Sequence, residues 1–315
     1  NTAREISIES TPELITEKSV SDYLDLGFNR ISCGIQSLLE SELSLALRKH
    51  TINDVKKSLK ILRRFRVPNV VFDLMIGIAG QTVRSFKKSV IRMIELRPDT
   101  IELYALGVMP FTKWSGCTQT FMPAKDLYRC YELGMELFLE NGYREDCHNR
   151  YALPGSGGFL QEDNVFKGEA LIGFGAGART YARNFHYRNS FSSDNHRNAI
   201  LRYMERMESG KSSIESGCTV SREEKMRQYA IYNIENLDVS DFEKRFGIQF
   251  ESFFGSMISD LCKLNLGSVS GKIFVLNKKG LLFRDLVAHE LYSPAMMLIE
   301  EKYRPILCER IIKKQ

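Results

Sequence analysis

The feature that most constrains the fold is a nearly continuous apolar run over residues 70–76, which is interrupted only by Asp73. Strands buried on both faces are apolar throughout, and such strands belong to parallel sheets that helices cover. Short runs of this kind alternate with segments of helical periodicity through the first part of the chain. Because four strand–helix steps are predicted, the expected fold is α/β with right-handed crossovers.

The chain is predicted to contain two domains, residues 1–194 and 195–315. The strands and helices of the first are expected, in chain order, at 6–8, 16–26, 30–36, 38–48, 52–66, 70–76, 83–96, 100–106 and 125–141. The polar, Gly-rich stretch 148–168 predicts a long loop. Beyond it the chain is mainly helical, with one hairpin near 272–277, and this order resembles a winged helix.

Composition excludes several classes of protein. At 315 residues, 43% hydrophobic and 26% charged, the chain is an ordinary globular one. It has no apolar run of about 18 residues, so no membrane span is expected. The net charge of +5 is dispersed, which argues against a nucleic-acid partner. Seven scattered cysteines without CxxC spacing indicate reduced thiols in a cytoplasmic protein and give no metal or iron–sulfur site.

Polar residues at strand ends are the first candidates for a site, because parallel sheets bind ligands at the carboxyl ends of their strands. Glu9 either accepts hydrogen bonds from a ribose or an amine, or caps the following turn. Asp73 needs a partner, which is either a neighbouring loop or a ligand. Gln36 offers a bidentate amide, and Arg48 either binds a carboxylate or phosphate or lies on a charged surface.

Glycine-rich and basic loops are weaker candidates. Residues 171–179 lack the spacing of a dinucleotide-binding loop and indicate only close backbone approach, to a ligand or to another segment. Residues 77–80 indicate the same. Arginines beside histidines in 148–151 and 186–189 could hold the carboxylates of an acidic substrate, although loop arginines are more often solvated.

Four sequence blocks follow one another along the chain: residues 5–12, 27–36 with GFNRISCGIQ, 73–82 with DLMIGIAGQT, and 171–178. Each resembles a successive block of the oxygen-independent coproporphyrinogen III oxidase family, whose relatives include a haem chaperone and haem-degrading or haem-methylating proteins. The resemblance covers about residues 5 to 180 well and the remainder more loosely.

The resemblance implies a partial (β/α)6 TIM-like barrel with a helical, winged-helix-like C-terminal domain. In the family a CxxxCxxC loop holds a [4Fe-4S] cluster, which cleaves S-adenosylmethionine (SAM) to a 5′-deoxyadenosyl radical. This chain lacks that triad and the first strands, so we expect an N-terminal truncation with the cluster ligands upstream of residue 1. By resemblance Glu9 would contact the SAM at the cluster, and Arg179 would lie near it. Ala79 replaces a proline usual in the family.

Four further residues receive roles from the resemblance. Gln36, Arg48 and Asp73 would line the region of a second SAM or of the substrate, and Gly107 would add backbone contacts. No catalytic residue and no metal ligand is assigned within the chain.

The resemblance leads to an oxidoreductase that decarboxylates tetrapyrrole propionates, with a reductant such as flavodoxin or ferredoxin. Two alternatives are a haem chaperone and a haem-modifying methyltransferase of the same family. In a chaperone, possible haem ligands are His148, His186, His196 and His289, although surface histidines are the commoner case. A nucleic-acid-binding winged helix is disfavoured by the mild charge.

Overall fold

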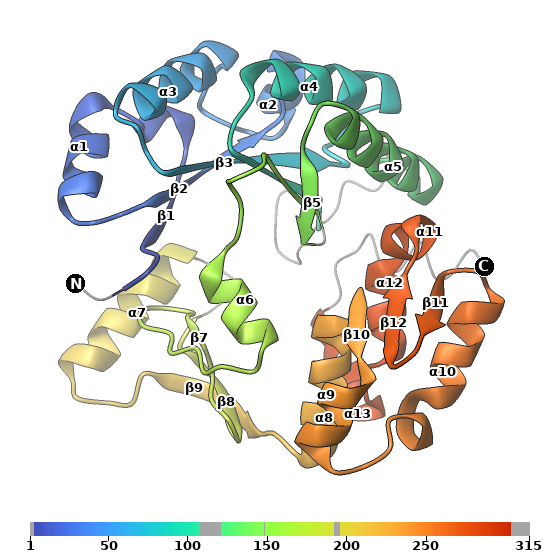
Figure 1. The fold of residues 1–315 in the computed structure, drawn as a ribbon. Helices are drawn as coiled ribbons and strands as arrows, with labels where there is room; N and C mark the ends of the chain where they lie inside the picture. The colour runs from blue at the N-terminus through green and yellow to red at the C-terminus, as the bar shows by residue number, and fades with distance from the viewer. Residues whose placement is uncertain (1–2, 108–120, 148, 192–195, 304–315) are drawn as a thin grey trace. The chain divides into compact units, whose positions relative to one another are not determined.

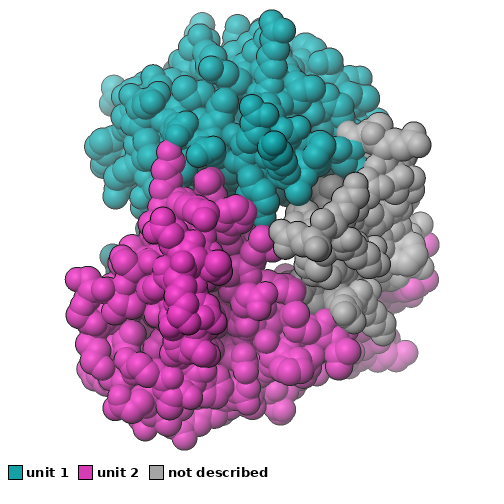
Figure 2. Space-filling model, turned by 90° about the vertical axis from the view of Figure 1, so that its right-hand side faces the viewer, with its two compact units in different colours: residues 1–158, 304–315 teal, residues 159–303 magenta. Residues whose placement is uncertain are grey.

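The computed structural model describes residues 3–107, 121–147, 149–191 and 196–303. The chain forms two compact units, which Figure 2 colours separately: one extends to Gly158, and the other is Phe159–Tyr303. Each unit is described by itself. The predicted domain boundary after residue 194 stays a prediction, because compact packing does not test which segments fold independently.

The first unit contains one six-stranded sheet in the order β1-β2-β3-β4-β6-β5. Strands β1 to β4 run parallel to one another, and β6 and β5 add an antiparallel edge. The strands are β1 (Ser7–Ser10), β2 (Arg30–Gln36), β3 (Asn69–Ile76), β4 (Thr100–Ala105), β5 (Arg144–Cys147) and β6 (Arg150–Ala152). The predicted parallel α/β architecture is therefore confirmed.

Helices α1 to α5 lie along one side of this sheet (Figure 1). With a short 3-10 helix they are η1 (Pro12–Leu14), α1 (Glu17–Asp25), α2 (Glu40–Leu45), α3 (Ile52–Arg64), α4 (Val83–Leu96) and α5 (Ala124–Glu140). Capping boxes begin α1, α3 and α4, where Thr16, Thr51 and Thr82 accept a backbone N–H through their side chains.

Strand β3 has two different faces. Val70, Phe72, Leu74 and Ile76 alternate along it and are fully buried, as expected for the face that helices cover. The intervening side chains point to the opposite face, where Asp73 is half-buried. The prediction of burial on both faces is confirmed at Val71, which is fully buried on this second face, and is wrong for Asp73.

The segment 148–168 is not one long loop, so that prediction was wrong. It contains β6 and also α6 (Leu160–Phe166). Strand β6 is only three residues long and is specified by antiparallel pairing with β4, which local periodicity does not reveal. Helix α6 has no side-chain cap at its N-terminus. The helix predicted over 38–48 is likewise shorter, because α2 ends at Leu45.

The second unit holds two three-stranded sheets, β7-β8-β9 and β10-β12-β11. Its strands are β7 (Arg179–Tyr181), β8 (Phe185–Asn189), β9 (Ile214–Thr219), β10 (Asn236–Asp238), β11 (Gly267–Ser270) and β12 (Ile273–Leu276). Its helices after α6 are α7 (His196–Glu208), α8 (Arg222–Asn233), α9 (Val239–Phe246), α10 (Glu251–Lys263), α11 (Lys278–Leu282), α12 (Arg284–Glu290) and α13 (Pro294–Tyr303).

The order α8–β10–α9–α10–β11–β12 is that of a winged helix, as predicted. An aromatic core holds it together, in which Phe242 packs edge-on against Phe250 and Phe254. The β7-β8-β9 sheet was not predicted. Across the described residues, no helix combines the length and the apolar character that a bilayer span requires.

Candidate functional site

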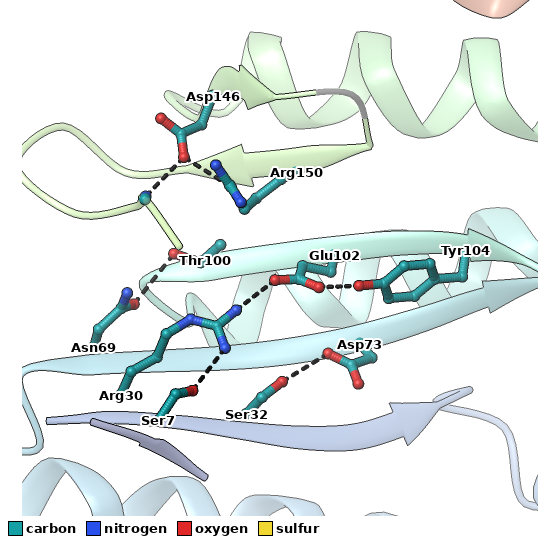
Figure 3. A network of polar contacts seen from close by, with 11 residues as sticks. Ser7, Arg30, Ser32, Asn69, Asp73, Thr100, Glu102, Tyr104, Asp146 and Arg150 are labelled. Carbon is teal, nitrogen blue, oxygen red and sulfur yellow. Dashed lines mark hydrogen bonds and ion pairs between the residues drawn. The ribbon is translucent and has the colours of Figure 1, made fainter. Parts of the chain in front are cut away.

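Polar side chains gather on the face of the first sheet that helices α1 to α5 leave uncovered (Figure 3). Strand pairing aligns them, since Ser7 lies beside Arg30 and Asp73 lies beside Glu102. The labelled members from the four parallel strands are Ser7, Arg30, Ser32, Asn69, Asp73, Thr100, Glu102 and Tyr104. Because one face of each strand is apolar and the other polar, this surface is where the sheet can contact a polar ligand.

Arg30 is the centre of this polar face. Its Nη2 lies 2.5 Å from Glu102 Oε1, and its Nη1 lies 3.0 Å from Ser7 Oγ. The Tyr104 hydroxyl donates to the other carboxylate oxygen of Glu102. Arg30 is 2% exposed and Glu102 8%, so both charges are buried and each compensates the other.

Asp73 is the one carboxyl of this face with a strongly shifted pKa among the described residues. Burial, together with the nearby Glu102 carboxylate, raises the pKa of Asp73 to about 7, although the hydrogen bond from Ser32 opposes the rise. The Ser32 hydroxyl lies 3.0 Å from Asp73 Oδ1. Asp73 therefore changes its charge near neutral pH, which is common among groups that contact ligands.

Gln36 ends β2 with a backbone φ of +68°, in the left-handed region that side chains rarely adopt. Its Oε1 is buried and has no hydrogen-bond partner in the described part of the chain. Its Nε2 folds over Gly34, where a Cβ would lie only 2.7 Å away. The missing side chain of Gly34 thus makes room for the Gln36 amide.

Arg48 reaches the same place from the segment after α2. Its Nη2 lies 2.8 Å from the carbonyl oxygen of Gly34 and would lie 3.4 Å from a Cβ on that glycine. A Schellman motif sets this course, since Leu47 has a φ of +55° and the N–H groups of Leu47 and Arg48 return to Ser44 and Leu43. Gln36 and Arg48, twelve positions apart in the sequence, therefore converge on Gly34.

The remaining predicted residues are Glu9, Gly107 and Arg179. Glu9 is exposed on β1 and pairs in register with Ser32, so it shares the polar face with Asp73. Gly107 is exposed just beyond β4. Arg179 is the exposed first residue of β7 and belongs to the second unit, so its predicted place near SAM stays a prediction.

The Gly-rich stretch before β7 approaches its own hairpin. A Cβ on Gly173 would lie 2.4 Å from the carbonyl oxygen of Arg179. The side-chain amide of Asn189 donates to the carbonyl oxygens of Gly173 and Gly175. Of the two alternatives, a ligand or another segment, the contacts of this stretch are with another segment.

Sequence reasoning missed Arg30 and Glu102, whereas Tyr104 begins the 104–110 stretch that was predicted as a strand end. The signal for Glu102 was available, because it interrupts the strand over 100–105 as Asp73 interrupts its own strand. Arg30 gave no such signal, because it stands at the very start of β2.

Comparisons with known proteins agree with this geometry. Residues 1–92 match the model of the Radical SAM superfamily. The chain is 27% identical to the heme chaperone HemW of Lactococcus lactis, over 83% of this chain and 68% of that protein. It is 25% identical to the oxygen-independent coproporphyrinogen III oxidase of Paracoccus denitrificans, over 76% of this chain and 54% of that protein. The solved structure of the Escherichia coli coproporphyrinogen III oxidase HemN superimposes with a TM-score of 0.76.

These comparisons support the radical SAM family of coproporphyrinogen oxidases and haem chaperones as the family that this chain resembles. The match to HemN covers 91% of this chain and 69% of the other at 19% identity, which confirms the predicted TIM-like fold. Because the chain spans 54% of the Paracoccus oxidase and 68% of the Lactococcus chaperone, the activity of the whole radical SAM protein is a matter for proposal.

The match of residues 1–92 to the Radical SAM superfamily implies SAM and a [4Fe-4S] cluster. The described residues include no group of three or more histidine, cysteine or acidic side chains placed to hold a metal, so they do not fit the cluster. They do fit SAM, because the unpaired Gln36 Oε1 and the Asp73 carboxyl can accept hydrogen bonds from its amine and hydroxyl groups.

Proposed function

We propose that this chain carries the SAM-binding strand ends of a radical SAM oxidoreductase that acts on a tetrapyrrole. The proposed reaction is the oxygen-independent oxidative decarboxylation of propionate side chains, with a reductant such as flavodoxin or ferredoxin in the cytoplasm. The observation that carries the SAM site is the convergence of Gln36 and Arg48 on Gly34, at the end of the strand beside Asp73.

Each of these side chains matches a different part of SAM. Asp73, when ionised, accepts from an ammonium group or a hydroxyl, and Gln36 Oε1 accepts from a second donor. Arg48 has donor positions beyond its single bond to Gly34 and can pair with the carboxylate of the methionine moiety. When bound, SAM supplies the 5′-deoxyadenosyl group that is the radical source in this superfamily.

The tetrapyrrole assignment is supported by relatives and not by a contact within the chain. The Paracoccus relative is named a coproporphyrinogen III oxidase, and the Escherichia coli structure that shares the fold is one as well. The uncovered polar face of the sheet gives such a substrate a surface beside the proposed SAM site.

The SAM site is tested by isothermal titration of the purified chain with SAM. We expect Gln36→Ala, Arg48→Ala and Asp73→Asn each to weaken binding at least tenfold, which corresponds to about 1.4 kcal/mol. Arg206→Ala is the matched control, because Arg206 also donates to backbone carbonyls but belongs to the second unit. Absence of SAM binding, or equal binding by all four variants, would refute the site.

The reaction is tested with the protein purified anaerobically from its natural source. Incubation with coproporphyrinogen III, SAM and a reductant should release carbon dioxide and yield protoporphyrinogen. SAM binding without decarboxylation would leave the cofactor site standing and remove the oxidase assignment.

A haem chaperone is the second candidate, supported by the similarity to the Lactococcus chaperone over 83% of this chain. Of its possible ligands, His186 is half-buried on β8, where burial lowers its pKa. His289 lies in α12, and its ring packs at a tilt against that of Tyr292. His148 lies outside the described residues. Two results would favour this candidate over the oxidase: stoichiometric haem binding that His186→Ala weakens, and the absence of a porphyrin product. A methyltransferase would instead transfer a methyl group to haem.

A further inference from the structure

The backbone at Gln36 is held in a tight, unfavourable turn. The N–H of Ser37 donates to the carbonyl oxygen of Ile35 at 2.8 Å, which closes a three-residue turn around Gln36 with its φ of +68°. Turns of this sense are rare and strained for residues other than glycine. Such a conformation persists only where the surroundings fix it, so neighbouring contacts must hold Ser37 and Gln36 in place.

The neighbouring contacts converge on Glu42, a carboxylate of α2 that is 3% exposed. Its Oε2 accepts from the Ser37 hydroxyl at 2.6 Å and from Gln81 Nε2 at 2.9 Å. Its Oε1 accepts from the Ser85 hydroxyl at 2.5 Å. Three donors therefore satisfy a carboxylate for which the described residues offer no ion pair, and hydrogen bonds to charged groups are the stronger kind.

The same network fixes two loops at the carboxyl ends of adjacent strands. After β2, the Ser37 hydroxyl also accepts the N–H of Leu39, 3.1 Å away. After β3, the Gln81 amide that donates to Glu42 accepts the N–H of Gly77 at 2.7 Å. Gly77 has a φ of +88°, which glycine adopts without steric cost, and the Gln81 amide fixes its N–H in this turn.

We infer that Glu42 is a positioning residue, which acts through Ser37 to hold Gln36 in its strained turn and so presents the Gln36 amide to SAM. The inference rests on the proposed SAM site. It assigns Glu42 no contact with the ligand: the side chain is buried and its oxygens are occupied by Ser37, Gln81 and Ser85.

The test compares SAM binding by Glu42→Leu and Glu42→Gln in the full chain. Leucine removes the acceptor that the three donors share, and we expect SAM binding at least tenfold weaker. Glutamine restores the network, because its carbonyl oxygen can accept from Ser37 and Gln81, while its amide faces a Ser85 hydroxyl that can turn toward Thr82. We therefore expect Glu42→Gln to bind SAM within about threefold of the wild type. Loss of binding by glutamine equal to that by leucine would overturn the inference, because the charge itself would then be needed.

A double-mutant cycle separates positioning from general destabilisation. If Glu42 acts through Gln36, then Glu42→Leu should cost little further SAM affinity in a Gln36→Ala background. Additive losses would contradict the inference. Ser37→Ala is a milder break of the same link, which introduces no large apolar side chain among the buried donors, and Ser58→Ala is its control. Ser58 is a fully buried serine of α3 whose hydroxyl donates to the carbonyl oxygen of Val55 in the same helix.

Hydrogen exchange makes the result independent of the SAM proposal. In Ser37→Ala and Glu42→Leu, the amides of residues 37–39 and 77 should exchange at least tenfold faster, while those of α3 stay unchanged. If the wild-type chain binds no SAM, the proposed SAM site is refuted. The exchange rates would still show whether Glu42 and Ser37 hold the backbone around Gln36 in place. Unchanged exchange in both variants would refute the positioning role even if SAM binds.

Discussion

The guanidinium of Arg30 on β2 reaches across β3 to the carboxylate of Glu102 on β4, with Nη2 and Oε1 2.5 Å apart. The two residues are 72 positions apart in the sequence, and their side chains are 3% and 11% exposed. This ion pair ties three parallel strands together on the polar face that carries Asp73.

Removing one partner of the Arg30–Glu102 pair should lower the free energy of unfolding. Arg30→Met leaves a buried carboxylate without its cation, and we expect a loss of about 3–5 kcal/mol in the free energy of unfolding. The double variant Arg30→Met, Glu102→Leu removes both charges and should recover most of that loss. Urea denaturation at pH 7 measures both values, and a double variant no more stable than the single one would contradict the expectation.

Asp73 should make the stability of the first unit depend on pH. Its pKa is raised from 3.8 to about 7 in the folded state, so folding favours the protonated form. Stability therefore falls as pH rises from about 4 to about 7. Asp73→Asn removes this penalty and should be more stable than the wild type above pH 7, by up to about 4 kcal/mol, with no difference near pH 4.

The measurement is urea denaturation of both proteins between pH 4 and 8. Asp260→Asn is the control, because Asp260 is a 65%-exposed carboxylate of α10 in the second unit. A difference between wild type and Asp73→Asn that stays constant with pH would show that the effect is not titration of this carboxyl.

The sequence revealed those features of the site that depend on local pattern. Asp73 interrupts an apolar strand, and Gln36 ends one, so both were recognisable as candidates. The left-handed turn at Gln36 was not, because it depends on Ser37 and Glu42 meeting Gln81 and Ser85 from a different loop and helix. No local propensity encodes that meeting.

The same limit applied to the fold. Parallel strands followed by amphipathic helices were predicted because their periodicity is local. Strand β6 was missed because three residues show no alternation, and its pairing with β4 is tertiary. Arg30 was missed because a charge at the start of a strand is ordinarily solvated. Here the guanidinium is buried and forms an ion pair with Glu102.

Gly34 should tolerate no side chain without loss of SAM binding. A Cβ there would lie 2.7 Å from Gln36 Nε2 and 3.4 Å from Arg48 Nη2. Because the Gln36 amide is the end of a flexible side chain, we expect Gly34→Ala to fold and to lose at most about 1–3 kcal/mol of stability. SAM binding should weaken at least tenfold, measured by titration calorimetry; wild-type affinity would show that neither side chain moves or that neither contacts SAM.

Relief of backbone strain should have opposite functional consequences at Gln36 and Leu47. Both residues have positive φ values, +68° and +55°, and left-handed backbone costs a non-glycine residue about 1–2 kcal/mol. Leu47→Gly should therefore raise the free energy of unfolding by up to about 1 kcal/mol, since Leu47 is 62% exposed and loses little burial. The SAM binding of Leu47→Gly should be unchanged.

Gln36→Gly should likewise keep or raise stability, yet it should lose SAM binding, because the strain at Gln36 serves to present its amide. Thermal denaturation and SAM titration of both variants decide this, and a Gln36→Gly protein that binds SAM normally would show that the turn serves only the chain's path from β2 to α2.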